Sequence, residues 1–310
     1  MTAALPDNSA PQAYRAKAFA GSGIALFIAG VFLFSAMDAL AKDLVAQSPA
    51  LQVVWLRYVI QAVVITAILA PRLHPRSPHP MPLRTAHPWG HFIRAVFQVG
   101  ATGFFFASLA HIGLAEATAL ADTNPVLITL GAALFLGERL TRARIIAVVV
   151  SMMGTLIILR PGFGVFTPAA LLPLGCAVCF AGNALMTRLL GQNEPAWTSL
   201  FYAAWFGTFM LTLALPFVWQ PLPMADLWRY VLLGLIGTAS QAAVIMAFSR
   251  SEAGLLAPFG YLGIVFASVW STLIYSAPPD LPTIIGALVI IGAGLYVWAG
   301  DHARKRPKHL

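Results

Sequence analysis

Charged side chains stand inside the apolar stretches of this sequence. Asp38, Arg57 and Asp122 each lie within a long run of apolar residues, and His111 ends such a run. A charge inside a lipid bilayer costs about 2.5–3.5 kcal/mol on insertion scales, so each one requires a partner or a task. Arginine can hold a carboxylate through two parallel hydrogen bonds, and aspartate can hold an ammonium group or carry a proton. The set therefore favours binding of a zwitterionic molecule, handling of a proton, or both.

Structural roles are the alternative for the same residues. Asp38 and Arg57 could form an ion pair that ties two helices together, and a histidine such as His111 is ordinary near a membrane surface. Two uncharged polar residues, Asn183 and Gln241, lie deep in apolar runs and are candidates for hydrogen bonding to a substrate. Hydrogen bonds between helices would explain these two residues equally well.

Aromatic residues and prolines provide the remaining candidates. Aromatic side chains could line a binding cavity, although the belts at membrane surfaces use the same residue types. Pro125 and Pro258 each remove a backbone donor inside an apolar run, so both are candidate hinges. The candidate cavity aromatics are Trp55, Tyr58, Tyr202, Trp205, Tyr261 and Trp270.

Other kinds of chemistry find little support. The sequence has no Gly-x-x-x-x-Gly-Lys segment to cradle a nucleotide phosphate and no His-Glu-x-x-His zinc motif. The two cysteines, Cys176 and Cys179, share one apolar run without a second Cys or His pair, so packing is the favoured interpretation. We expect neither a cofactor nor a bound metal, and no catalytic residues. An intramembrane enzyme remains an alternative, but Asp38, His111 and Asp122 are its only candidate set and no nucleophile accompanies them.

The elements that position these residues are predicted to be membrane-spanning helices. Hydrophobic residues make up 59% of the 310 residues and charged residues 10%, with a mean hydropathy of +0.80. A soluble protein would carry about 25% charged residues. A spanning helix needs about 20 apolar residues, and runs of this length favour helices over barrel strands. Ten such runs occur, at 22–42, 52–70, 89–110, 115–136, 143–160, 168–190, 196–218, 228–249, 254–275 and 281–299.

The ten runs divide into two similar sets of five. Phe34 to Leu40 in run one resembles Phe180 to Leu185 in run six, so that Asp38 aligns with Asn183. Pro-Ala pairs open runs two and seven, and Glu-Ala pairs precede runs four and nine. Because five is odd, the second set must enter the membrane from the opposite face, as in many secondary transporters. We predict an all-α membrane protein of ten transmembrane helices in two inverted five-helix repeats. Its segments are a tail at 1–17, repeats at 18–161 and 162–300, and a basic tail at 301–310.

The positive charges predict the orientation. With all ten runs spanning and the N-terminus in the cytoplasm, fifteen of the nineteen Lys and Arg residues lie on the cytoplasmic side. Such an excess is typical of cytoplasmic loops and argues against a nucleic-acid-binding role for the net charge of +8. Both termini are then cytoplasmic, and the membrane is the bacterial inner membrane. The other side receives Lys42, Arg57, Arg160 and Arg229.

The sequence resembles a known family at several of these positions. The segments Ala121–Pro125 and Phe135–Thr141, supported by Phe34–Lys42 and Trp55–Tyr58, look like the EamA domains of the drug/metabolite transporter superfamily. The resemblance covers about residues 20–300 and implies ten helices around a central cavity. It also implies that the protein moves small metabolites through this cavity by alternating access. Within the superfamily, the sequence resembles YddG-like bacterial exporters of aromatic and other amino acids. The expected partners are the lipid bilayer, protons, and an amino acid or similar amphiphilic metabolite. Uptake or exchange of a nucleotide-derived or sugar substrate is the alternative within the superfamily.

Overall fold

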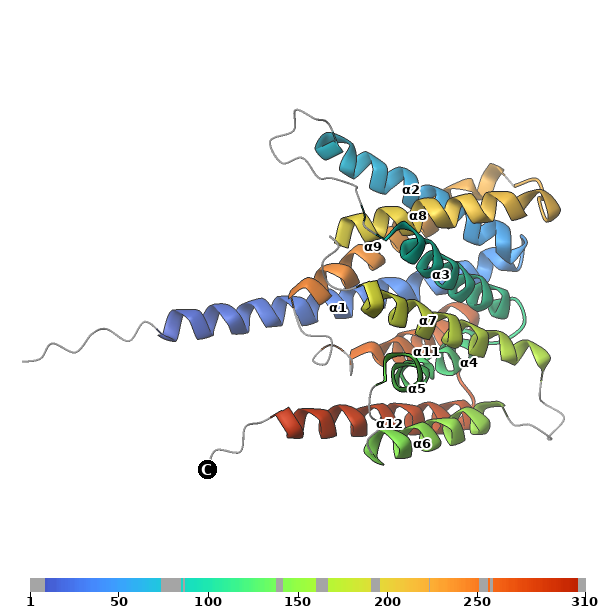
Figure 1. The fold of residues 1–310 in the computed structure, drawn as a ribbon. Coiled ribbons are helices and arrows are strands. Elements are labelled where there is room, and N and C mark those ends of the chain that lie inside the picture. The colour runs from blue at the N-terminus through green and yellow to red at the C-terminus, as the bar shows by residue number, and fades with distance from the viewer. Residues whose placement is uncertain are drawn as a thin grey trace, which may run out of the picture.

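The computed structural model is a bundle of helices (Figure 1). It describes residues 9–73, 85, 87–137, 142–159, 167–190, 196–222, 224–250, 256 and 259–305, and no strand occurs among them. The α-helices are α1 (Ser9–Val45), α2 (Ala50–Leu73), α3 (Pro88–Leu109), α4 (Leu114–Ala121), α5 (Asn124–Leu136), α6 (Arg142–Leu159), α7 (Leu171–Leu190), α8 (Ala196–Ala214), α9 (Leu227–Arg250), α11 (Leu262–Tyr275) and α12 (Leu281–Lys305). Short 3₁₀ turns are η1 (Pro168–Ala170), η2 (Leu215–Phe217) and η3 (Met224–Asp226).

The helices match the apolar runs, with three main differences. α12 continues to Lys305, so the first half of the basic tail expected at 301–310 is helical. α1 begins at Ser9, so the second half of the expected tail is helical, and it projects from the bundle in Figure 1. The run predicted at 115–136 is divided into α4 and α5 by a turn at Asp122 and Thr123. Part of the run at 254–275 lies outside the described residues.

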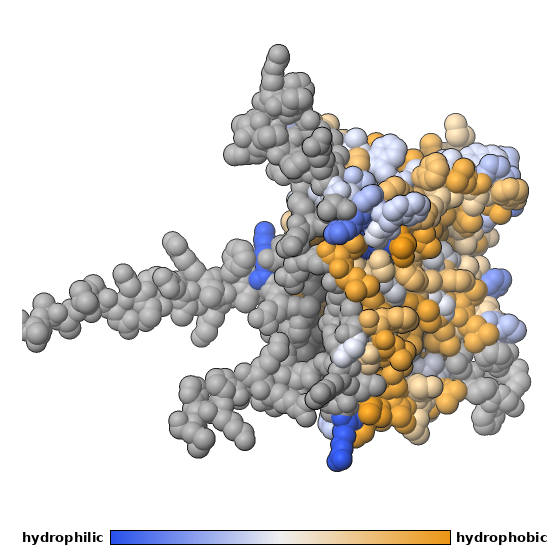
Figure 2. Space-filling model, in the orientation of Figure 1, coloured by the Kyte–Doolittle hydropathy of each residue, from blue (hydrophilic) through white to orange (hydrophobic). Residues whose placement is uncertain are grey.

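Length and composition allow many of these helices to cross a membrane. Within the described chain, seven helical segments are long and apolar enough to span. Three shorter apolar helices, in α6, α11 and α12, accompany them. Apolar residues cover most of the visible face between the two ends of the bundle, and the most hydrophilic visible residues lie near those ends (Figure 2). This band is the surface expected of a protein surrounded by lipid.

Helices from opposite ends of the sequence pack side by side. α1 packs along α9, α3 along α7, and α6 along α12. α2 contacts both α8 and α9, while α4 contacts α7 and α11. The main apolar core is formed by buried side chains of α1, α2, α3, α4, α9 and α11, including Leu44, Val53, Phe106, Leu120 and Leu233.

The bundle has two distinguishable ends. The first residue of α1 and the last of α12 lie at the same end, which we call the terminal end (Figure 1). The opposite end, which we call the Lys42 end, holds the C-terminal end of α1 and the N-terminal ends of α2 and α9. Contacts join these helix ends directly, because Ser48 after α1 hydrogen-bonds through its hydroxyl to that of Tyr230 in α9 at 2.7 Å.

Candidate functional site

Arg57 is the most deeply buried of the predicted charged residues. It lies on α2 with only 2% of its surface exposed. Its Nη1 donates a hydrogen bond to Oγ1 of Thr102 on α3 at 3.2 Å, and its guanidinium lies 5.3 Å from the ring centre of Tyr58. Its Nε is buried with no hydrogen-bond partner among the described residues. Guanidinium donors therefore remain available for a bound anion.

Asp38 lies near this guanidinium and also near Asp122. Both are half-buried, and Asp38 on α1 feels the charges of Arg57 and Asp122. Within the described chain no salt bridge joins Asp38 to Arg57, and Oδ2 of Asp122 has no hydrogen-bond partner. Cys176 on α7 also lies within electrostatic range of both carboxylates, so α7 borders the region around Asp38 and Asp122. Charges of both signs thus face one region without neutralising each other by contact.

The break between α4 and α5 places Asp122. Asp122 caps the C-terminal end of α4, and the break falls inside the apolar segment Leu114–Phe135. The hydroxyl of Thr123 donates to the carbonyl of Leu120 at 2.8 Å, and the side-chain amide of Asn124 donates to that of Ala121 at 3.1 Å. These side chains satisfy carbonyls that a continuous helix would have satisfied. Interrupted helices are a common location for binding groups in transporters.

Of the two predicted hinge residues, Pro125 lies within the described residues and Pro258 does not. Pro125 occupies the second position of α5, where its missing N–H costs little. The helix is therefore broken just before this proline rather than kinked at it. Pro258 lies outside the described residues. A hinge role for either residue stays a prediction.

Gly237 was not anticipated from the sequence, yet it shapes the space around Arg57. A Cβ at this position of α9 would lie 2.9 Å from Nε of Arg57 and 2.9 Å from Sδ of Met37. The absence of a side chain thus lets α9 approach the guanidinium closely. No sequence signal marks this glycine, because its importance depends on which helix packs against α2.

The predicted polar residues lie on two different helices. Gln241 on α9 accepts a hydrogen bond from Nε2 of Gln61 on α2 at 3.1 Å, while Oε1 of Gln61 is buried with no partner among the described residues. Asn183 on α7 is half-buried, and its Oδ1 also has no partner there. Gln241 therefore makes the helix-to-helix bond that was the alternative, whereas Asn183 keeps a free acceptor.

Two predicted aromatic residues lie beside the charges. Tyr58 is fully buried next to Arg57 on α2. Tyr261 precedes α11 and lies within electrostatic range of Asp122. Its hydroxyl occupies the space that a side chain at Gly294 of α12 would take.

The other predicted aromatics lie elsewhere. Trp55 donates through Nε1 to Thr212 at 2.8 Å and packs edge-on against Trp219. Trp205 is 45% exposed and donates to Thr66, and Tyr202 stacks on His91 with ring centres 5.3 Å apart. Trp270 is half-buried, and its ring centre lies 5.6 Å from that of Phe32. Its Nε1 has no hydrogen-bond partner in the described chain. His111 is exposed in the turn after α3.

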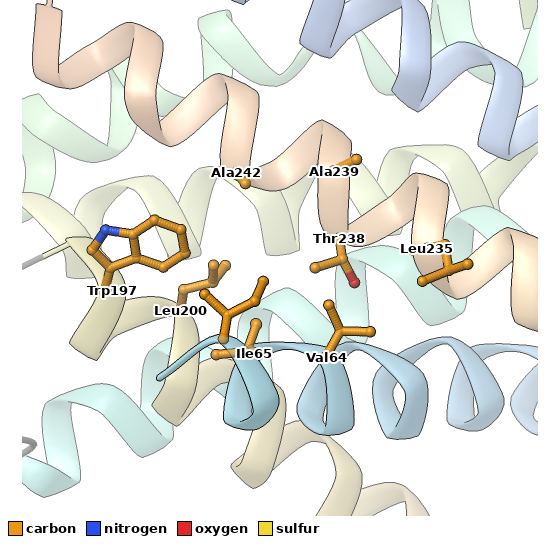
Figure 3. Close-up of a pocket in the computed structure, with 9 residues that line it drawn as sticks. Val64, Ile65, Trp197, Leu200, Leu235, Thr238, Ala239 and Ala242 are labelled. Atoms are coloured by element: carbon orange, nitrogen blue, oxygen red, sulfur yellow. The ribbon is translucent and has the colours of Figure 1, made fainter. Parts of the chain in front are cut away.

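A pocket of about 270 Å³ lies apart from these charges, between α2, α8 and α9 (Figure 3). Its lining is aliphatic or aromatic except for Thr238, whose hydroxyl donates to the backbone of Gly234 at 2.7 Å. Ile68 and Leu235, which also line it, are 51% and 44% exposed. The pocket is thus an apolar surface groove without groups for recognising a charged molecule.

Known proteins resemble this chain along nearly all of its length. The model of the EamA-like transporter family matches twice, at residues 21–160 and 167–298. The pseudopaline exporter CntI of Pseudomonas aeruginosa is 30% identical over 277 residues, which are 88% of this chain and 94% of that protein. A riboflavin transporter of Brucella anthropi is 28% identical and covers 83% of this chain and 91% of its own. An S-adenosylmethionine uptake transporter of Rickettsia bellii is 24% identical, over 89% of this chain and 92% of its own.

A solved crystal structure shows the same fold. It superposes with a TM-score of 0.65 and covers 92% of this chain and 99% of its own, at 23% sequence identity. The family and these relatives are transporters rather than enzymes, and the chain carries several helices able to span a membrane. This protein is therefore a multi-pass membrane transporter of small molecules that belongs to the EamA-like transporter family.

Proposed function

We propose that this protein is a secondary transporter that exports amino acids, aromatic ones included, by alternating access through a central cavity. The observation that carries the proposal is the buried guanidinium of Arg57 near Asp38, which itself lies near Asp122, with no contact ion pair among the three. A free amino acid carries one carboxylate and one ammonium group. Its carboxylate would pair with Arg57 and its ammonium group with an aspartate, so that both buried charges become compensated.

The proposed framework for this movement is ten helices in two inverted repeats. Helix packing supports it when α1 is matched with α7, α2 with α8, α3 with α9, α4 and α5 with α11, and α6 with α12. The packing of α1 on α9 then corresponds to that of α7 on α3, and α1 on α11 corresponds to α7 on α4 and α5. The contacts α2 with α8, α4 with α11, and α6 with α12 each correspond to themselves. Such reciprocal packing is what a two-fold axis in the membrane plane produces.

The proposed location is the bacterial inner membrane, with the terminal end of the bundle in the cytoplasm. The described ends of α1 and α12 lie at the same end, as an even number of spans requires (Figure 1). The fifteen-to-four division of positive charges supports the same orientation. In this orientation the Lys42 end faces the periplasm.

We further propose that a proton accompanies the substrate. Asp38 and Asp122 are half-buried carboxylates in the membrane interior, and Oδ2 of Asp122 has no partner among the described residues. Carboxylates in such positions form the proton relays of many membrane transporters. A proton on one aspartate would lower the net charge of the site when no substrate is bound.

Uptake of a nucleoside-derived metabolite is the second candidate. It is favoured by the relatives whose names specify riboflavin and S-adenosylmethionine. S-adenosylmethionine itself ends in an amino-acid group, so Arg57 and Asp122 could bind it as they would bind a free amino acid. The two candidates differ in the part of the molecule beyond that group.

The test is counterflow by the purified protein in proteoliposomes. Vesicles loaded with unlabelled amino acids should accumulate radiolabelled phenylalanine or another amino acid in a saturable manner, faster with a pH gradient. S-adenosylmethionine and riboflavin serve as the second set of substrates. Saturable counterflow of these two alone would establish the second candidate, and absence of any amino-acid counterflow would refute the first.

A further inference from the structure

Lys42 links α1 to the corner between α3 and α4. Its Nζ donates to the carbonyl of Leu109, the last residue of α3, at 3.1 Å and to that of Ile112 at 2.7 Å. The C-terminal end of a helix carries partial negative charge and free carbonyls, so an ammonium group is favoured there. The same Nζ lies 5.7 Å from the ring centre of Tyr275 on α11. One side chain thus contacts three elements at the Lys42 end.

Tyr275 adds a second link at the same place. Its hydroxyl donates to the backbone carbonyl of Ala39 on α1 at 2.6 Å. Ala39 follows Asp38 in α1, so this contact holds the same turn of α1 that carries one of the site carboxylates. The Tyr275 ring also feels the charges of Asp43 and Arg229.

Asp43 and Arg229 form the third link. Their ion pair joins α1 to the first turn of α9, and Nη1 of Arg229 is also 3.5 Å from Oδ1 of Asp226. The Arg229 and Asp43 side chains are 24% and 35% exposed. Partly exposed ion pairs are weak, so this link can break and re-form during a transport cycle.

At the other end of the bundle, the position that matches Lys42 holds no lysine. In the alignment of Asp38 with Asn183, the residue that matches Lys42 is Thr187 on α7. Thr187 is exposed, and its hydroxyl donates to the carbonyl of Asn183 in its own helix at 2.8 Å. The links at the Lys42 end thus hold α1 to α3, α9 and α11, and the matching position on α7 makes no such link among the described residues.

We propose that Lys42, Asp43, Arg229 and Tyr275 form a gate that closes the Lys42 end over Asp38, Arg57 and Asp122. The gate rests on the proposed transport cycle and its orientation, in which this end faces the periplasm. Opening requires Lys42 to leave the carbonyls of Leu109 and Ile112 and the Asp43–Arg229 ion pair to separate. A static cap on α3 is the competing explanation for Lys42.

Accessibility of a reporter cysteine tests the gate without requiring a known substrate. Cys176 and Cys179 are replaced by alanine, and Thr102→Cys provides a thiol beside Arg57. A charged, membrane-impermeant methanethiosulfonate is then applied to right-side-out or inside-out vesicles. Lys42→Met and Tyr275→Phe should each speed labelling from the periplasmic side by about tenfold and slow it from the cytoplasmic side, because the gate favours one of two states.

Matched variants separate the gate from general loosening. Thr212→Val removes the acceptor of the Trp55 indole at the same end, and it should leave both labelling rates unchanged. The single changes Asp43→Arg and Arg229→Asp should each speed periplasmic labelling, and the combined swap should restore the slow rate. Equal acceleration from both sides would show that the residues only stabilise the fold and would overturn the gate.

The outcomes also distinguish the gate from the proposed substrate. Opposite changes on the two sides without any amino-acid counterflow would retain the gate and refute the amino-acid proposal. Amino-acid counterflow with unchanged labelling in folded Lys42→Met and Tyr275→Phe variants would retain the substrate and refute the gate.

Discussion

At the scale of single residues, the arrangement of charges around Arg57 matters more than their number. A buried guanidinium bonded to one threonine hydroxyl is far from fully compensated. The carboxylate of Asp38 acts on it over a longer distance than a salt bridge. The guanidinium and the carboxylate are thus close but not paired. A molecule that carries both a negative and a positive charge can bind to both of them.

The first prediction concerns the geometry of Arg57. Arg57→Gln should lower the initial rate of amino-acid counterflow by about 10–100-fold, since a charge-assisted hydrogen bond contributes about 1.5–3 kcal/mol. Arg57→Lys should fall between this variant and the wild type, because lysine keeps the charge and loses the planar fork. Arg142→Gln, at an exposed arginine, is the control. Equal activity of Arg57→Gln and the wild type would exclude Arg57 from binding.

The second prediction concerns Asp122. Asp122→Asn should reduce transport and remove its dependence on a pH gradient, because the amide cannot carry a proton. Folding should be retained, since Oδ2 has no partner to lose within the described chain. Counterflow measured with and without the gradient, together with gel filtration of the purified variant, provides the check. A wild-type rate would indicate a structural role for this carboxylate.

Sequence reasoning selects these residues as candidates because charge in an apolar run is rare. Asp38, Arg57 and Asp122 were predicted for that reason, and the structure brings their helices together. Gly237 and the contacts of Lys42 could not be predicted in the same way. In the sequence, Lys42 is simply the last residue of an apolar run. Only the position of α3 in the structure shows which carbonyls it binds.

At the scale of helices, hydropathy predicted the elements well, but not the break within one of them. Leu114 to Phe135 is apolar enough to be a single span, and its interruption depends on local hydrogen bonds. Thr123 and Asn124 can bond to the preceding carbonyls, and Pro125 cannot continue the backbone bonding. These three adjacent residues were visible in the sequence, but the proline alone predicted a kink rather than a break.

The third prediction tests the close approach of α9 to α2. Gly237→Ala should displace the guanidinium of Arg57 and lower counterflow by about 10–100-fold, because misplacement by about 1 Å is enough to disrupt a binding geometry. The displaced atoms are ends of flexible side chains, so the fold should persist. Gly103→Ala is the matched control, since a Cβ there has nothing within 4 Å. Similar transport by both variants would contradict the role given to Gly237.

The fourth prediction tests the packing of α6 against α12. A Cβ at Gly286 would lie 2.6 Å from the backbone oxygen of Gly154, which cannot move without shifting the helix. Gly286→Ala should therefore lower the stability in detergent by about 1–3 kcal/mol. Gly292→Ala, where a Cβ meets open space, should be neutral or slightly stabilising. Thermal unfolding of both variants is the measurement, and equal midpoints would refute the close contact.

At the scale of the whole molecule, the fifth prediction concerns the opposite orientation of the two halves. Gln47 lies two residues beyond the C-terminal end of α1, and Leu189 lies in the last turn of α7, which is the helix matched with α1. Both are exposed. In a background without native cysteines, Gln47→Cys should react with impermeant maleimide from the periplasm and Leu189→Cys from the cytoplasm. Reaction of both from the same side would rule out inverted repeats.

The pairing of α6 with α12 has a mechanical consequence. These are the closing helices of the two halves, and they lie together at one edge of the bundle (Figure 1). Their backbones meet at Gly154 and Gly286 with no intervening side chain that could yield. We expect the contact between α6 and α12 to stay fixed while the remaining helices tilt about it. Opening of the bundle at one end would then narrow it at the other end.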